Sequence, residues 1–316
     1  MKTLQQLLGI ELPVLQAPMA GVQGSALAVA VSNAGGLGAL PCAMLSADAL
    51  RKELAAIRSQ TSKPYNVNFF CHIPPEFDAG REAAWRALLA PYYAEYGIDP
   101  GSIGGGAGRA PFTSEAADVL EEFRPAVMSF HFGLPAADLL ERVRSWGAKV
   151  LSSATTVEEA LWLEERGVDA VIVQGLEAGG HRGHFLSDDL TVQVGTFALV
   201  PRVVAAVKVP VIASGGIADA KGVAAAMRLG AAGVQVGTAY LLCPECTTSA
   251  VHRAALKSEE ARHTALTNLF SGRPARGIVN RVMRDLGPIR EEAPEFPLAS
   301  SGIAPLRAKA ESRGLG

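Results

Sequence analysis

Two glycine-bearing turns in the second half of the chain could hold a phosphate group. Ser214-Gly215-Gly216 ends one apolar segment just ahead of a helix that Asp219 would cap, and Gly237-Thr238 ends the next segment. Glycine lets the main chain approach a ligand closely, and converging N–H groups at such turns bind anions. The glycines could instead only make tight turns, but two such turns in succession favour a phosphate site.

Amide side chains and small residues elsewhere would suit a flat polar ring. Asn68, Gln174 and Gln235 lie at or near the ends of apolar segments, and each carries both a donor and an acceptor, which match the edge of a flavin. Ala17 and Met19 follow the first segment and would let the ring lie against the backbone. A phosphosugar enzyme would need catalytic carboxylates or lysines at these positions, and few occur. A flavin, which supplies the redox chemistry itself, is therefore the favoured ligand.

His181 is the titratable residue best placed for catalysis. It lies in the glycine-rich segment 178–183, which we expect to be a flexible loop. An imidazole can remove a proton from a weak carbon acid near neutral pH. A single histidine is often an ordinary surface residue, but its place beside a predicted cofactor favours a base. His131 also ends an apolar segment and could contact substrate or only pack, while His72 and His184 are weaker candidates.

The order of apolar and amphipathic segments predicts how these residues are positioned. Eight apolar segments are nearly continuous, which is typical of parallel strands buried on both faces. They are residues 14–19, 37–42, 65–71, 126–132, 150–154, 170–174, 211–215 and 233–238. Helix-like stretches lie between them, at residues 25–34, 46–59, 114–123, 135–146, 157–166, 197–207 and 219–229. The expected N-caps are Ser46, Thr156 and Asp219, and the glycines expected to end helices are Gly35, Gly147, Gly167 and Gly230.

This alternation predicts an α/β fold, specifically a (β/α)₈ TIM barrel. A doubly wound Rossmann sheet is the alternative, but it would need a glycine-rich turn after the first strand, and this chain has none there. The segment 101–108 (GSIGGGAG) follows no strand, and we expect a flexible loop tip there. In such barrels functional groups follow the carboxyl ends of the strands, and phosphate sites follow strands seven and eight, where Gly216 and Gly237 lie.

Two segments exceed a minimal barrel. Residues 72–111 follow the third strand and include a helix at 79–96, which is the length of a lid or binding loop. Residues 242–316 include an expected helix at 248–269 and then a Gly/Pro/Arg-rich stretch. We expect residues 1–241 to form the flavin-binding barrel and both segments to cover its mouth. The alternatives are a homodimer contact or a packed appendage.

The composition excludes several kinds of partner. Lys and Arg total 29 against 31 Asp and Glu, and no basic stretch is dense enough for nucleic acid. No apolar run could span a membrane, and the N-terminus lacks a signal-peptide pattern. Four cysteines are too few for a disulfide scaffold, so we expect a cytoplasmic protein. Cys243-Pro-Glu-Cys246 has the spacing of a redox motif without its context, and no metal site is expected.

Several motifs, taken in this order, resemble those of the nitronate monooxygenase (2-nitropropane dioxygenase) family, class I-like. They are QAPMAG at 16–21, SFHFG at 129–133, QGLEAGGHRG at 174–183, SGGI at 214–217 and QVGT at 235–238. GRPARG at 272–277, continuing to Asn280-Arg281, belongs to the same pattern. The resemblance runs from about residue 10 to about residue 310.

The resemblance implies a non-covalent FMN and assigns roles to residues. Ala17, Pro18 and Met19 would line the flavin ring, Asn68 and Gln174 would hydrogen-bond the cofactor, and His181 would be the catalytic base. The implied cofactor-binding set is Ala17, Pro18, Met19, Asn68, Gln174, Gly179, Gly180, Ser214, Gly215, Gly216, Gln235, Gly237 and Thr238.

The implied reaction oxidises an alkyl nitronate, such as propionate 3-nitronate, with O₂ to a carbonyl compound and nitrite. With a neutral nitroalkane, His181 would first remove the α-proton, and no nicotinamide cofactor is needed. Two departures leave the substrate preference open, because His252 and Phe296 stand where the family pattern has tyrosines. The candidate substrate contacts are His131, His252 and Lys309, the last in a segment that could reach an anionic substrate.

Other functions stay open from the sequence. A flavin-dependent NAD(P)H enoyl-acyl-carrier-protein reductase or an NADH:quinone reductase would share the barrel and the cofactor. Rapid anaerobic bleaching of the flavin by NADH would support either of them. A flavin-binding regulatory barrel would bind without turnover, and a phosphosugar-binding barrel would stay colourless with FMN.

Overall fold

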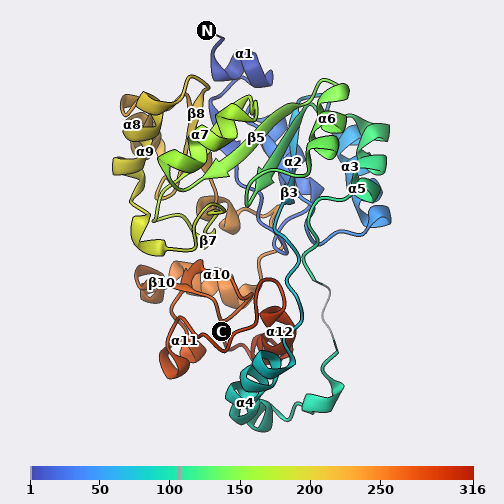
Figure 1. Cartoon of the computed structure of the whole chain (residues 1–316), viewed down its shortest axis with the longest axis vertical. Helices are drawn as coiled ribbons and strands as arrows, with labels where there is room; N and C mark the ends of the chain where they lie inside the picture. Colours follow the sequence, from blue (N-terminus) through green and yellow to red (C-terminus); the bar gives the residue numbers. More distant parts are fainter. Residues whose placement is uncertain (1, 105–107) are drawn as a thin grey trace. The chain divides into compact units, whose positions relative to one another are not determined.

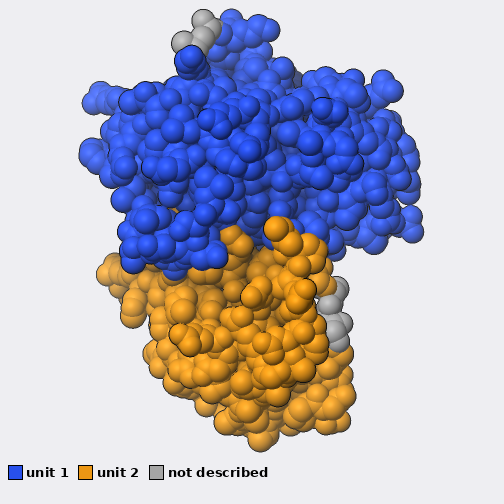
Figure 2. All heavy atoms as spheres, in the orientation of Figure 1, with its two compact units in different colours: residues 1–72, 110–178, 183–247 blue, residues 73–109, 179–182, 248–316 orange. Residues whose placement is uncertain are grey.

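The computed structural model describes residues 2–104 and 108–316, which form two compact units (Figure 1; Figure 2). Unit 1 comprises Met1–His72, Ala110–Ala178 and Gly183–Thr247. Unit 2 comprises Ile73–Arg109, Gly179–Arg182 and Thr248–Gly316. The segment after the third strand therefore folds with the C-terminal extension, and four residues around His181 join them. Residues 105–107 of the expected loop tip lie outside the described residues, and Pro100–Ser102 form a 3₁₀ turn, η1.

Unit 1 is an eight-stranded parallel barrel, which confirms the predicted fold. Its strands run in the order β1-β9-β8-β6-β5-β4-β3-β2, and a parallel bridge from Leu15 to Leu37 brings the two ends of the sheet together. All eight predicted segments are strands: β1 Val14–Gln16, β2 Gly38–Pro41, β3 Tyr65–Phe70, β4 Val127–His131, β5 Lys149–Ala154, β6 Ala170–Gln174, β8 Val211–Ser214 and β9 Gly233–Val236.

The helices between the strands also follow the prediction. They are α2 Ser25–Asn33, α3 Ala47–Gln60, α5 Ser114–Phe123, α6 Ala137–Ser145, α7 Val157–Glu165, α8 Thr196–Ala206 and α9 Ala220–Arg228. Ser46, Thr156 and Asp219 each accept a hydrogen bond from the first turn of their helix, as N-caps do. Each glycine expected to end a helix has a positive φ: Gly35, Gly147, Gly167 and Gly230.

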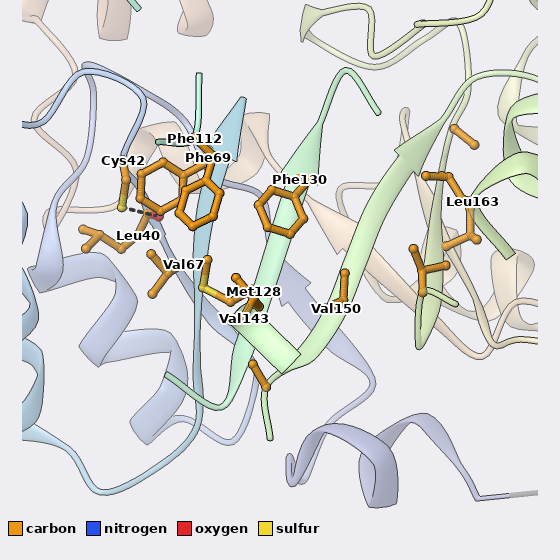
Figure 3. Close-up of a cluster of buried hydrophobic side chains, with 14 of the residues drawn as sticks. Leu40, Cys42, Val67, Phe69, Phe112, Met128, Phe130, Val143, Val150 and Leu163 are labelled. Carbon is orange, nitrogen blue, oxygen red and sulfur yellow. Dashed lines mark hydrogen bonds between the residues drawn. The ribbon is translucent and has the colours of Figure 1, made fainter. Parts of the chain in front are cut away.

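The two faces of the strands have different neighbours. Val67, Phe69 and Phe130 belong to the large cluster between the strands and the helices, where Phe112 packs 4.8 Å from Phe69 and 5.6 Å from Phe130 (Figure 3). Because side chains alternate along a strand, the residues between them face the barrel interior.

Apolar residues fill one end of that interior. Leu15, Leu151 and Ile212 come from three strands and form one cluster with Leu4 and Leu8 of α1, a helix at Leu4–Leu8 that the sequence did not predict. These apolar positions lie toward the amino ends of the strands. On the same faces, two residues further along, stand Ser153 and Ser214, so the interior becomes polar toward the carboxyl ends.

Unit 2 contains a helical pair and a small antiparallel sheet. Helix α4 (Ala79–Tyr96), predicted with these bounds, packs on α12 (Ala299–Ser312). Trp85 Nε1 donates to the Ala299 carbonyl at 3.2 Å, and Tyr93 Oη donates to the Gly302 carbonyl at 2.7 Å. The sheet has the order β10-β11-β7, from Thr264–Thr267, Ala275–Ile278 and Gly180–His181.

The predicted helix at 248–269 is wrong beyond Lys257. Helix α10 is Ala250–Lys257, and a 3₁₀ turn, η4 (Glu259–Arg262), leads into strand β10. Ser258 is extended, with ψ 170°, and its side chain caps the new turn by accepting from Glu260 N. The later stretch, predicted without helices, contains α11 (Arg281–Leu286) and α12. Pairing of β10 with β11 could not be inferred from local periodicity.

No helix among the described residues is long and apolar enough to cross a membrane.

Candidate active site

Three polar side chains form a row across neighbouring strands of unit 1. Gln174 of β6 is in register with Ser214 of β8, and Ser214 is in register with Gln235 of β9. Gln174 and Ser214 are buried, and Gln235 Oε1 is a buried atom with no hydrogen-bond partner among residues 2–104 and 108–316. An unpaired buried carbonyl is costly unless a ligand or water supplies a donor. The predicted residues Gln174, Ser214 and Gln235 are therefore brought together, and Gln235 has capacity left for a ligand.

Gly237 lies beside the segment that follows β1. A Cβ built on Gly237 would stand 3.4 Å from Ala17 Cβ and 4.0 Å from Met19 Sδ, and Ala17 N donates to the Val236 carbonyl at 2.8 Å. Ala17, Met19 and Gly237, which are far apart in sequence, thus meet at the carboxyl ends of β1 and β9. The small size of Ala17 and Gly237 leaves backbone accessible at this edge, as a flat ring would require.

A pair of glutamines holds the segment after β1, and sequence reasoning did not single it out for this. Gln16 Nε2 donates to Gln23 Oε1 at 2.7 Å, Gln23 Nε2 donates to the Ala39 carbonyl at 2.6 Å, and Ala39 N donates to Gln16 Oε1 at 2.8 Å. Both glutamines are buried, so this closed set fixes the chain on either side of Ala17 to Met19.

Asn68 is oriented by a serine on the next strand. Its Nδ2 donates to Ser129 Oγ at 2.9 Å and to the Ser129 carbonyl at 3.2 Å, and Asn66 Nδ2 reaches the same Oγ at 2.8 Å. The Asn68 amide nitrogen is therefore engaged by the protein. Any cofactor bond that uses the Asn68 acceptor would have to be made at Oδ1.

His131 is held by contacts within unit 1. Its Nδ1 lies 2.8 Å from Ser153 Oγ, and its ring packs 4.5 Å from the Phe132 ring. Gly183 passes so close that a Cβ there would lie 2.7 Å from His131 Cε1, while Gly183 N donates to Gln174 Oε1 at 2.8 Å. This packing accounts for the glycine at 183 and suits His131 to orienting the residues around it.

Phe132, the next residue, has φ +69°, which a non-glycine residue rarely adopts. Gly133 follows with φ +90°, and Ser152 Oγ donates to the Gly133 carbonyl at 2.7 Å. Strained backbone of this kind concentrates at functional sites, where surrounding contacts maintain it. The sequence carried no signal for it.

Gly215 is explained by a close approach of Thr196, the first residue of α8. Gly215 has φ +115°, and a Cβ there would lie 2.9 Å from Thr196 Oγ1. Thr196 N donates to Glu177 Oε2 at 2.8 Å, so the amino end of α8 is occupied by a carboxylate and is not free for a phosphate. Gly216, with φ +71°, and the Gly237-Thr238 turn remain as the candidate anion-binding backbone. Glu177 and Thr196 were not predicted.

His181 belongs to unit 2 and lies in strand β7 rather than in the expected flexible loop. It pairs with Ala275 of β11, its Nε2 lies 2.8 Å from Ser271 Oγ, and its ring meets the Phe296 ring edge-on at 5.3 Å. Ser271 is buried, with 2% of its surface exposed. His181 is thus held in one orientation by Ser271 and Phe296. Ser271, 90 residues away in sequence, had no signal of its own in the chain.

Gly179, Gly180, His252 and Lys309 also belong to unit 2. Lys309 is exposed in the last turn of α12. Burial lowers the pKa of His252, the positive charge of Arg307 lowers it further, and Glu311 opposes the shift. No cluster of His, Cys, Asp or Glu suited to a metal ion occurs in the described part of the chain.

Comparisons with known proteins agree with this arrangement. The family model described as nitronate monooxygenase matches residues 1–314. The nitronate monooxygenase of Pseudomonas aeruginosa is 44% identical over 315 residues, which is 98% of this chain and 89% of that protein. That of Paraburkholderia phytofirmans is 43% identical over 320 residues, covering 99% and 86%.

Solved structures give a similar result. Nitroalkane oxidase from Streptomyces ansochromogenes matches 99% of this chain and 88% of its own, with 38% identity and a TM-score of 0.89. FabK from Thermotoga maritima matches 90% of this chain and 77% of its own, with 31% identity and a TM-score of 0.69. Since the family model spans almost the whole chain and curated relatives share more than two fifths of its residues, the chain belongs to the nitronate monooxygenase family, whose members are oxidoreductase enzymes.

Proposed function

We propose that this enzyme binds FMN and oxidises alkyl nitronates with O₂ to a carbonyl compound and nitrite. The observation that carries the cofactor is the buried Oε1 of Gln235, which has no partner in the described part of the chain and lies in a row with Gln174 and Ser214. Family membership supports the reaction. FMN, when bound, accepts electrons from the substrate and is reoxidised by O₂.

The residues of unit 1 fit a flavin mononucleotide. Ala17, Pro18 and Met19 would lie against the ring, and Gln174 and Gln235 would hydrogen-bond its polar edge, with Asn68 contributing Oδ1. Backbone N–H groups at Gly216, Gly237 and Thr238 would hold the phosphate, because Glu177 occupies the amino end of α8. Ser214 and Gly215, the remaining members of the predicted set in unit 1, would shape the backbone around it.

His181 would act as the base. A neutral nitroalkane must lose its α-proton to become a nitronate, and an imidazole can accept it. The protonated ring then donates from Nε2 to Ser271 Oγ. The Ser271 hydroxyl can accept that bond because its own proton can go to the Arg273 carbonyl, 3.3 Å away. A nitronate supplied ready-made would not need this step.

The decisive experiment is oxygen uptake with propionate 3-nitronate, run beside an NADH control. We expect rapid uptake with nitrite release, and no rapid anaerobic bleaching of the flavin by NADH. The variant H181N should lose activity with a neutral nitroalkane but keep more of it with the preformed nitronate. Unchanged rates of H181N with the neutral nitroalkane would show that His181 is not the base.

A second candidate is the NAD(P)H-dependent reductase that the sequence left open, because it would use the same barrel and flavin. Fast bleaching by NADH without nitronate oxidation would favour it over our proposal.

A further inference from the structure

Arg109 of unit 2 is a half-buried cation, and none of the described residues pairs with it. No hydrogen bond or ion pair of its guanidinium occurs within residues 2–104 and 108–316. Its one described contact is with the Phe296 ring, whose centroid lies 5.9 Å from Arg109 Cζ. A guanidinium has five N–H donors, and an arginine withdrawn from water is normally paired with a carboxylate or carbonyls.

The charges nearby increase this deficit. Burial lowers the pKa of Arg109, and the positive charge of the nearby Arg307 lowers it further. Arg307 itself pairs with the carboxylate of Glu311, with Nε and Oε1 3.1 Å apart. Unit 2 therefore holds surplus positive charge at Arg109, and a contact with an aromatic face offsets only part of the lost hydration.

Phe296 links this cation to the proposed base. The centre of the Phe296 ring lies 5.3 Å from the centre of the His181 ring and 5.9 Å from Arg109 Cζ. Arg109 Cζ is therefore no more than about 11 Å from the His181 ring centre. A molecule that contacts both Arg109 and His181 needs about 3 Å at each end for the contact itself. Only a few covalent bonds of that molecule therefore fit between the two side chains.

We propose that Arg109 determines substrate specificity by binding a carboxylate a few bonds away from the carbon that His181 deprotonates. The planar guanidinium can pair with both carboxylate oxygens at once, and the partly dehydrated surroundings strengthen the pair. The inference rests on the proposed function, because it assigns one end of the substrate of the same site.

The test compares two nitronates and one carboxylate. In the FMN-loaded enzyme, R109M should raise KM for propionate 3-nitronate about 10- to 100-fold, the loss expected for a charged hydrogen-bonded pair. KM for butyl-1-nitronate, which lacks the carboxylate, should change less than about threefold. R109K keeps the positive charge but not the planar guanidinium that pairs with both carboxylate oxygens. Its KM for propionate 3-nitronate should therefore lie between the values of R109M and the wild type.

The matched control is R262M, which removes an exposed arginine of unit 2 that pairs with the exposed Glu259. It should leave both KM values unchanged, and equal thermal midpoints of R109K, R262M and wild type would show that folding is intact. Equal losses of R109M on both nitronates would overturn the carboxylate assignment, as would no loss on either.

Binding of succinate, measured by calorimetry, separates this inference from the proposed function. Succinate carries carboxylates but no nitro group, so it reports on Arg109 even if the wild type oxidises no nitronate. We expect R109M to weaken succinate binding at least about tenfold. No binding of succinate to the wild type, or equal binding to R109M, would overturn the proposal.

Discussion

Replacing Gly237 by alanine tests the cofactor site, because it should weaken FMN binding while leaving the stability of the fold almost unchanged. Its φ is −117° and its ψ is −79°, so alanine needs no left-handed backbone there. The new methyl group would meet Ala17 Cβ at 3.4 Å and Met19 Sδ at 4.0 Å, both ordinary contact distances. We therefore expect the unfolding free energy of the FMN-free protein to change by less than about 1 kcal/mol in G237A.

Binding of FMN should respond far more strongly. If the main chain at Gly237 lies against the cofactor, the methyl group keeps it from approaching and removes a hydrogen bond to a charged group. Such a bond contributes about 1.5–3 kcal/mol, which corresponds to an increase in Kd of about 10- to 100-fold. Urea unfolding of the stripped protein and quenching of flavin fluorescence measure the two quantities separately.

Two other glycines serve as controls for G237A. A Cβ at Gly277 meets nothing within 4 Å, so G277A should change neither stability nor affinity. G215A should unfold the protein more easily, because Gly215 has φ +115° and a Cβ there would press on Thr196 Oγ1. FMN affinity of G237A equal to that of G277A would refute the cofactor site at this turn.

Three further substitutions test hydrogen bonds and a shifted pKa. S271A should lower the rate with neutral nitroalkanes about tenfold, because the imidazolium of His181 loses its hydrogen-bond acceptor. The effect on preformed nitronates should be smaller, and equal effects on both substrates would contradict the role of Ser271. E159A should cost about 3 kcal/mol in urea unfolding, because the buried Glu159 carboxylate accepts from Thr155 N, Phe185 N and Leu186 N. His252, whose pKa is lowered on folding, binds its proton more readily in the unfolded chain, so stability should fall as pH drops below the ordinary value of 6.5 and level off below the folded pKa. H252N should show a smaller fall, and equal unfolding curves of the two proteins against pH would exclude this contribution.

Local pattern was enough to predict the barrel because each strand is a short apolar run and each helix carries its own caps. Ser46, Thr156 and Asp219 act on residues three positions away, so their effect is encoded within one turn. The prediction failed where the determining contact is distant. Thr264 pairs with Ile278 rather than continuing a helix, and no periodicity within 248–269 signals that partner.

The same division applies to the site. Residue types alone indicated amides, glycine turns and one histidine at the strand ends, because those groups suit a flavin whatever their exact placement. Only the tertiary structure paired His181 with Ser271 and set Thr196 against Gly215. It also left Gln235 Oε1 and the Arg109 guanidinium without partners among the residues that the structure describes. Hydrogen bonds and desolvation depend on atoms brought together from distant parts of the chain, and spacing along the sequence does not record those distances.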